Sequence, residues 1–145
     1  MILFPANGEE LIIIPDFFLS MIPPTTTSQE KGLAVGKNGK PYAYTKYKNR
    51  AVENEFYRLL LPHKPKTPLT GPVMLTVLWS FPKGKSHKDG EWKITKPDTD
   101  NLQKILKDIM TKAGFWVDDS RVCCETVLKQ WSDIPGIYIS YGEMT

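Results

Sequence analysis

Residues 101–114, NLQKILKDIMTKAG, carry the clearest periodicity in the sequence. Their apolar side chains recur at the i, i+3, i+4, i+7 spacing that places them on one helix face. Gly114, a residue type that favours a left-handed backbone, supplies a C-terminal stop. The sequence therefore predicts an amphipathic helix over 101–113, with a buried face formed by Leu102, Ile105, Leu106, Ile109, Met110 and Ala113.

Alternating apolar and polar residues predict strands on both sides of this helix. Residues 73–81 alternate between Gly71 and Pro82, which are typical strand boundaries. A second helix is predicted over 45–61, because its apolar stripe ends at a proline. The remaining predicted strands are 11–14, 17–22, 122–131 and 137–141.

The length of 145 residues is typical of one domain. Helices interspersed with strands predict the α+β class, as a single mixed α/β domain over residues 1–145. We expect one sheet of about four to five strands packed against two helices, since a sheet must bury one face against another layer.

The overall charge decides little about function. The net charge is +3 and the pI about 8.8, below the value of about 9 typical of nucleic-acid-binding domains. The first ten residues carry no basic side chain, unlike a signal peptide. The apolar runs are far shorter than a membrane span needs. We therefore expect a cytoplasmic protein without membrane association.

Lysines gather in two polar segments, residues 25–44 and 83–97, which we predict to be basic loops. The first is long enough to be either a functional loop or partly disordered. Solvated loop charge explains either segment alone, whereas two such segments flanking an acidic site suit a polyanionic substrate. The candidate DNA-binding residues in and beside these loops are Lys37, Lys40, Lys46, Lys83, Lys85, Lys88, Lys93 and Lys96.

Two aspartates, Asp98 and Asp100, precede the predicted helix. Pro97 favours an extended approach, in which residues i and i+2 share one face, so both carboxylates would point to the helix mouth. A structural role is also open, because Asp100 and Gln103 fit a capping box and the helix dipole favours Asp98. The pair alone does not decide between capping and metal binding.

Asp119 offers a third carboxylate. The helix would be about 20 Å long, and residues 115–119, if extended, span about 17 Å. A chain that reverses at Gly114 could therefore return Asp119 to Asp98 and Asp100. Three adjacent carboxylates repel one another unless a cation lies between them, and hard oxygen ligands suit Mg²⁺ or Mn²⁺.

Lys104 lies one helical turn after Asp100, on the same face. It could form a surface ion pair worth under about 1 kcal/mol. Alternatively, it could contact a scissile phosphate and stabilise the charge of the transition state. A divalent cation beside such a lysine suits in-line hydrolysis of a phosphodiester.

From Asp98 onward the sequence resembles the RusA family of Holliday-junction resolvases. The similarity runs through DxDNLQK at residues 98–104 and TKAGFWxDD at residues 111–119, and on to Val122. It is close over residues 96–122 and extends in outline from Phe17 to Gly142.

This resemblance implies a homodimeric, Mg²⁺-dependent endonuclease that resolves four-way DNA junctions by paired nicks in recombination and repair. No small-molecule cofactor is implied. By motif position, Asp98, Asp100 and Asp119 are the catalytic, metal-binding carboxylates and Lys104 is the catalytic lysine. A two-fold dimer would present two identical sites to a two-fold junction.

The sequence departs from the family pattern in three places. Pro97 stands where the family has a basic residue, so Lys96 or Lys93 would have to replace that phosphate contact. Residues 1–15 form an N-terminal extension, and the segment 25–44 is longer than in the family.

Three other functions fit part of the pattern. An Asp-x-Asp nucleotide-sugar transferase would leave Asp119 and Lys104 without a role. A non-catalytic protein that only binds branched DNA would not require the four motif residues, which are Asp98, Asp100, Asp119 and Lys104. A nuclease with relaxed specificity would cut flaps or replication forks in place of junctions. Metal-dependent paired nicking of a four-way junction separates these alternatives from the resolvase.

Overall fold

The computed structural model describes residues 2–3, 12–13, 15–25, 29–47 and 50–144. For residues 2–3, 12–13, 29–32 and 43–47 it describes the backbone alone. Most of the predicted N-terminal extension, and the ends of the predicted strand 11–14, therefore lie outside the described residues. Within that region, β1 (Ile2–Leu3) pairs with β2 (Ile12–Ile13).

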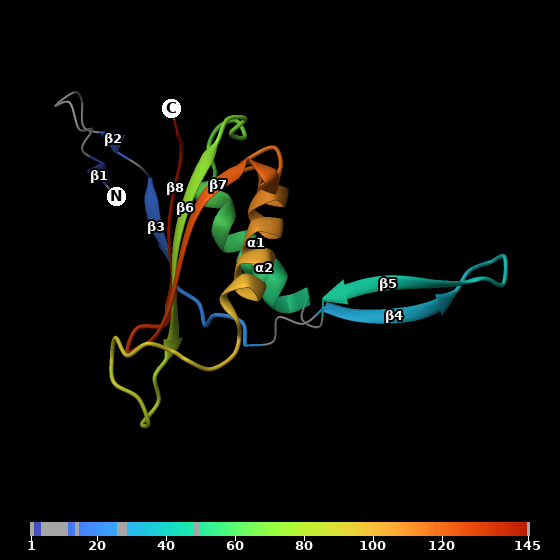
Figure 1. Cartoon of the computed structure of the whole chain (residues 1–145), viewed down its shortest axis with the longest axis horizontal. Helices are drawn as coiled ribbons and strands as arrows, with labels where there is room; N and C mark the ends of the chain where they lie inside the picture. Colours follow the sequence, from blue (N-terminus) through green and yellow to red (C-terminus); the bar gives the residue numbers. More distant parts are fainter. Residues whose placement is uncertain (1, 4–11, 14, 26–28, 48–49, 145) are drawn as a thin grey trace.

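A four-stranded mixed sheet forms the centre of the molecule, in the order β3-β8-β6-β7 (Figure 1). The central strand β6 pairs antiparallel with β8 and parallel with β7, and β8 pairs antiparallel with β3. These strands confirm the predicted α+β class. Their bounds are β3 (Asp16–Leu19), β6 (Val73–Pro82), β7 (Val122–Ser132) and β8 (Gly136–Glu143).

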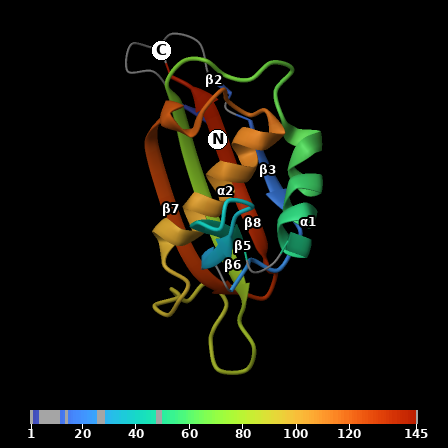
Figure 2. The ribbon, with the colours of Figure 1, turned by 90° about the vertical axis from the view of Figure 1, so that its right-hand side faces the viewer.

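Two helices, α1 (Arg50–Leu60) and α2 (Thr99–Ala113), cover one face of this sheet (Figures 1 and 2). A short 3-10 helix, η1 (Leu61–His63), ends α1. The predicted periodicities are confirmed, because the inward residues of β6 and the apolar stripe of α2 form one core. Its fully buried members include Val73, Leu75, Val77, Trp79, Leu102, Leu106 and Met110.

The predicted basic loop 25–44 is wrong in its structure, because most of it is a β-hairpin. β4 (Gln29–Val35) pairs antiparallel with β5 (Pro41–Tyr47), and we call this hairpin the arm. Figure 1 shows the arm extending away from the helices. A tight turn closes the arm: Gly36 N–H donates to Lys40 O at 3.0 Å, and Gly39 has a φ of 75°.

The first residues of the predicted helix 45–61 belong to strand β5, which ends at Tyr47. The helix α1 begins at Arg50. The physical reason is pairing: residues 41–47 all have Cα partners in β4, and this register outweighs the weak helical pattern of that stretch.

The parallel strands β6 and β7 are joined through α2, which makes a βαβ unit. The predicted loop 83–97 is confirmed as the connection from β6 to α2. This unit positions the candidate site, since residues after β6 and at the beginning of α2 come together at one end of the molecule.

Candidate active site

Asp98 lies at the N-cap position of α2, with an extended backbone (φ −73°, ψ 148°). Its carbonyl oxygen accepts the Leu102 N–H at 3.1 Å, but its carboxylate makes no capping hydrogen bond. Asp100 follows in the first turn, and both side chains are exposed. Neither carboxylate has a hydrogen bond or ion pair within the described part of the chain. Both are therefore available to a ligand.

The predicted capping box of Asp100 and Gln103 is wrong, because Asp98 is the N-cap residue and the Gln103 side chain is buried against the sheet. Trp79 Nε1 donates to Gln103 Oε1 at 2.8 Å, and Gln103 Nε2 donates to Glu125 Oε1 at 3.1 Å. Lys107 then pairs with the same carboxylate at 2.9 Å. This network ties α2 to β6 and β7 and fixes which helix face meets solvent.

Lys104 is exposed on that solvent face, one turn after Asp100. The surface ion pair considered for it is not found, since no ion pair of Lys104 occurs among the described residues. The ammonium group is therefore free to meet an incoming anion one helical turn from Asp100.

Asp119 begins the 3-10 helix η2 (Asp119–Arg121), which lies near the other end of α2. Two sets of contacts from β7 establish this direction. Lys129 reaches the residues just before α2, whereas Glu125, earlier in the strand, reaches the middle of the helix. β7 thus runs antiparallel to α2, and η2, which precedes β7, lies toward the helix C-terminus.

The expected return of Asp119 to Asp98 and Asp100 within one chain is therefore wrong. The physical reason is that the chain starts β7 beside the first residue of the parallel strand β6, where Val73 is partnered with Val122. Most of the length of α2, about 20 Å, separates Asp119 from Asp98. Among the described residues, no three His, Cys, Asp or Glu side chains are grouped to hold a metal ion.

Asp118, next to Asp119, has a local role. The Ser120 hydroxyl donates to Asp118 Oδ2, and this hydrogen bond lowers the pKa of the Asp118 carboxyl. The interaction closes the turn that leads into β7.

The lysines of the loop 83–97 divide into exposed and engaged groups. Lys85, Lys88 and Lys96 are exposed, as are Lys37 and Lys40 at the tip of the arm. By contrast, Lys83 is half-buried and pairs with Asp133 at 3.3 Å. The side chain of Lys46 lies outside the described residues.

Lys93 is not a surface residue, contrary to its predicted role as a DNA contact. It is 7% exposed, and its ammonium group donates to Thr95 Oγ1 at 2.5 Å and to Lys96 O at 2.6 Å. Burial lowers the pKa of Lys93, and the neighbouring Lys129 lowers it further. Of the two proposed replacements for a basic residue at Pro97, only Lys96 is exposed.

Lys129 is a residue of this region that the sequence reasoning missed. Its ammonium group donates to Thr95 O at 2.6 Å and to Pro97 O at 2.7 Å. The alternation of β7 shows only that a lysine can face solvent there, so no pattern in the sequence signals these contacts.

Backbone hydrogen bonds hold the base of the loop 83–97 to the end of β7. Gly90 N–H donates to Trp131 O, and Trp131 N–H donates to Glu91 O, each at 2.8 Å. His87 stacks on the Trp131 ring with centroids 4.1 Å apart. The loop is thus fixed to the sheet beside the start of α2.

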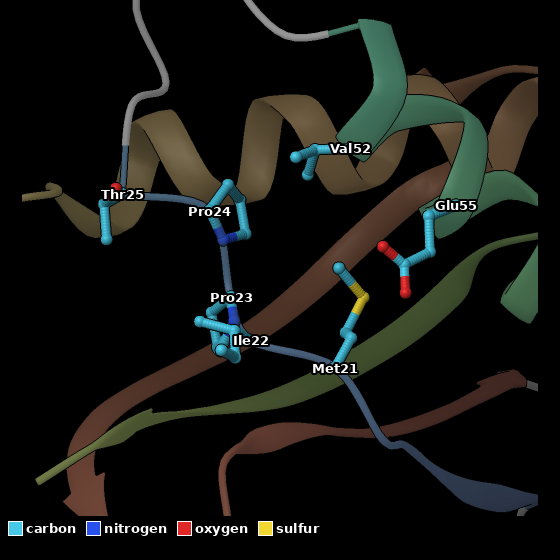
Figure 3. A pocket seen from close by; sticks show the side chains of 7 residues that line it. All are labelled: Met21, Ile22, Pro23, Pro24, Thr25, Val52 and Glu55. Atoms are coloured by element: carbon cyan, nitrogen blue, oxygen red, sulfur yellow. The ribbon is translucent and has the colours of Figure 1, made fainter.

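A separate cavity of about 380 Å³ lies between residues 21–25 and α1 (Figure 3). Its lining is mostly apolar, and the Glu55 carboxylate faces Met21 across it. None of the predicted site residues lines it. Separately, none of the described helices combines the length and the apolar character needed to cross a bilayer.

Exposed carboxylates at a helix mouth, an adjacent lysine and a lysine-bearing loop suit the cleavage of a phosphodiester. Residues 22–141 match the family model described as Endodeoxyribonuclease RusA. This match covers most of the chain, so the chain belongs to the RusA family of endodeoxyribonucleases.

Individual relatives agree with this family. The chain is 32% identical over 110 residues to the Crossover junction endodeoxyribonuclease rusA of Lactococcus phage r1t, covering 74% of this chain and 79% of the relative. It is 28% identical over 120 residues to the uncharacterized protein YqaN of Bacillus subtilis strain 168, covering 75% and 84%. A shorter stretch of 32 residues is 56% identical to the Crossover junction endodeoxyribonuclease RusA of Escherichia coli K12, covering 22% and 27%.

Proposed function

We propose that this protein is a structure-selective endonuclease that resolves Holliday junctions by paired, metal-dependent nicking of DNA. The observation that carries the proposal is the pair of exposed, unpartnered carboxylates at the start of α2, with Lys104 one turn inside the helix. The junction substrate is taken from the names of the phage and bacterial relatives. Recombination and repair of DNA in the cytoplasm would be the setting of this reaction.

Asp98 and Asp100 fit a magnesium site by their chemistry. Mg²⁺ prefers oxygen ligands and is commonly held by one or two carboxylates, with waters and substrate phosphates completing its shell. Both carboxylates are exposed and unpartnered among the described residues, so binding would break no existing contact. When bound, Mg²⁺, or Mn²⁺ in its place, supplies positive charge at the scissile phosphate.

The protein's own residues would do the rest of the chemistry. Lys104 would donate to a non-bridging oxygen of the scissile phosphate and stabilise the charge that develops during cleavage. The exposed Lys85, Lys88 and Lys96 lie on the loop that leads to Asp98 and would contact the DNA backbone. The arm would add Lys37 and Lys40 at its tip.

Asp119 would enter the site from a second copy of the chain. It lies toward the far end of α2 from Asp98 and Asp100, yet it matches the family motif. In a two-fold dimer, each contact from the first copy to the second is matched by the same contact from the second to the first. Antiparallel packing of the two copies would therefore place the Asp119 of each copy beside the Asp98 and Asp100 of the other. Such a dimer would hold two complete sites for two opposing strands.

The test uses a labelled, immobile four-way junction with Mg²⁺ or with EDTA, and with the variant Asp100→Asn. We expect symmetric nicks that need the metal and disappear in the variant. Asp108→Asn is the matched control, because it removes the same charge from the same helix away from its N-terminus. Junction binding without metal-dependent cleavage would show a non-catalytic binding protein, and cleavage of flaps alone would show a relaxed nuclease.

A further inference from the structure

Two lysine ammonium groups hold the three residues that lead directly into Asp98. Lys129 donates to Thr95 O at 2.6 Å and to Pro97 O at 2.7 Å. Lys93 donates to Thr95 Oγ1 at 2.5 Å and to Lys96 O at 2.6 Å. Every residue from 95 to 97 therefore accepts a hydrogen bond from a charged donor, and such bonds are stronger than neutral ones.

The arrangement is unusual because two cations lie together without an anion. Within the described residues, neither Lys93 nor Lys129 is paired with a carboxylate. The Lys93 ammonium instead lies over two rings, 5.1 Å from the Phe81 centroid and 4.4 Å from the Trp131 centroid. Burial of an ammonium group costs free energy unless hydrogen bonds compensate for the lost water. The hydrogen bonds of Lys93 to residues 95 and 96 therefore stabilise the conformation of this segment.

Anchoring of the loop does not explain these contacts. The loop is already joined to β7 by backbone hydrogen bonds, including Lys93 N–H to Lys129 O at 3.1 Å and Gly90 N–H to Trp131 O at 2.8 Å. The ammonium groups act further along, on residues 95–97, which make no backbone–backbone hydrogen bond among the described residues before α2 begins. The two ammonium groups therefore act on the backbone immediately before Asp98.

We propose that Lys129 and Lys93 are positioning residues, which fix the backbone entering Asp98 so that the Asp98 and Asp100 carboxylates are held ready for one divalent cation. This inference rests on the proposed function, since it concerns the same site. The two lysines touch neither carboxylate in the structure and act through the carbonyl groups of residues 95–97. Groups that orient metal ligands in this indirect way commonly change metal affinity by about 10- to 100-fold.

The variant Lys129→Met tests the proposal, because methionine keeps an apolar stem of similar length and removes the charged donor. The first measurement is Mn²⁺ binding to the protein without DNA, followed by electron paramagnetic resonance. The second is affinity for a four-way junction in EDTA. We expect Mn²⁺ affinity to fall about tenfold or more. Junction affinity should stay within about twofold of wild type, because the Lys129 ammonium group is engaged by the carbonyl groups of Thr95 and Pro97.

Lys107→Met is the matched control. Lys107 is also a half-buried lysine whose ammonium group is engaged, at 2.9 Å from Glu125 Oε2, but it lies in the middle of α2. We expect its loss to lower thermal stability without changing Mn²⁺ affinity. Lys129→Arg, which keeps a charged donor, should recover part of the Mn²⁺ affinity that Lys129→Met loses, which a merely packing role would not predict.

Three results would overturn the positioning role. Equal Mn²⁺ affinity in Lys129→Met and wild type, both folded by circular dichroism, would show that the ammonium group does not affect the ligands. A loss of junction affinity in EDTA as large as the loss of Mn²⁺ affinity would make Lys129 a DNA contact. If the wild-type protein binds no Mn²⁺ at all, the proposed metal site fails, and the positioning role fails with it.

Discussion

Mixing two inactive variants would separate a site built within one chain from a site built across a dimer. Asp100→Asn damages the carboxylate pair at the start of α2, and Asp119→Asn damages the carboxylate that begins η2. In a mixed dimer, the Asp119→Asn protomer keeps its Asp98 and Asp100, and its partner keeps an intact Asp119. If sites form across the dimer, one of the two sites is then complete.

The expected recovery of activity follows from the distance between Asp98 and Asp119 and from the fraction of dimers that are mixed. About 20 Å of helix between Asp98 and Asp119 is far beyond the roughly 2.1 Å at which an oxygen ligand holds Mg²⁺, so one chain cannot supply all three ligands. Random assembly of the two variants gives mixed dimers about half of the time, each with one complete site of two. An unfractionated mixture should therefore recover roughly a quarter of the wild-type sites, and mixed dimers purified away from the like dimers about half.

The assay is cleavage of an end-labelled four-way junction by co-expressed variants that carry different affinity tags, purified through both tags. Mixed dimers should nick one strand and leave the opposing strand intact. The matched control is a mixture of Asp98→Asn with Asp100→Asn, in which every carboxylate pair is damaged. If the first mixture stays as inactive as this control, the reasoning from the length of α2 is refuted.

Three further changes test the role of single residues. Lys104→Met should lower the rate of cleavage by roughly 100-fold in single-turnover assays, and an equal loss of metal-free junction affinity would contradict a role in the chemical step. Replacing Lys37 and Lys40 by Gln should reduce the slope of log affinity against log salt by about 1 each, and an unchanged slope would show that the arm does not touch phosphates. Gly136→Ala should destabilise the fold by about 1–3 kcal/mol in urea unfolding, because its Cβ would lie 2.6 Å from the backbone oxygen of Leu19; unchanged stability would contradict the close packing of β3 on β8.

Periodicity predicted the elements whose apolar residues face the core. The helix α2 and the strand β6 each bury one regular face, so the sequence pattern and the burial coincide. The arm escaped prediction because its strands pair with each other, and none of their described side chains belongs to the core. Leu33 and Val35 on β4 are apolar but exposed, so the alternation of apolar residues in this strand does not indicate a buried face.

Only part of the geometry of the candidate site could be predicted from the sequence. Asp98, Asp100 and Lys104 are close in sequence, so helix spacing was enough to place them together. Asp119 is separated from them by a helix and a turn, and only the parallel pairing of β6 with β7 shows which way the chain returns. The contact of Lys129 with Pro97 spans 32 residues, which no local pattern describes.

The attachment of the loop 83–97 at Lys83 and at Gly90 makes the segment between these residues a place where the protein can be altered without disturbing its scaffold. Lys83 N–H is bonded to Ser132 O on one side and Gly90 N–H to Trp131 O on the other, while residues 84–86 between them are exposed. A dye or a short peptide inserted at Gly84 would therefore be carried on a fixed base. It would report the approach of DNA to the start of α2, and loops of other lengths could be exchanged there to change which DNA structures are accepted.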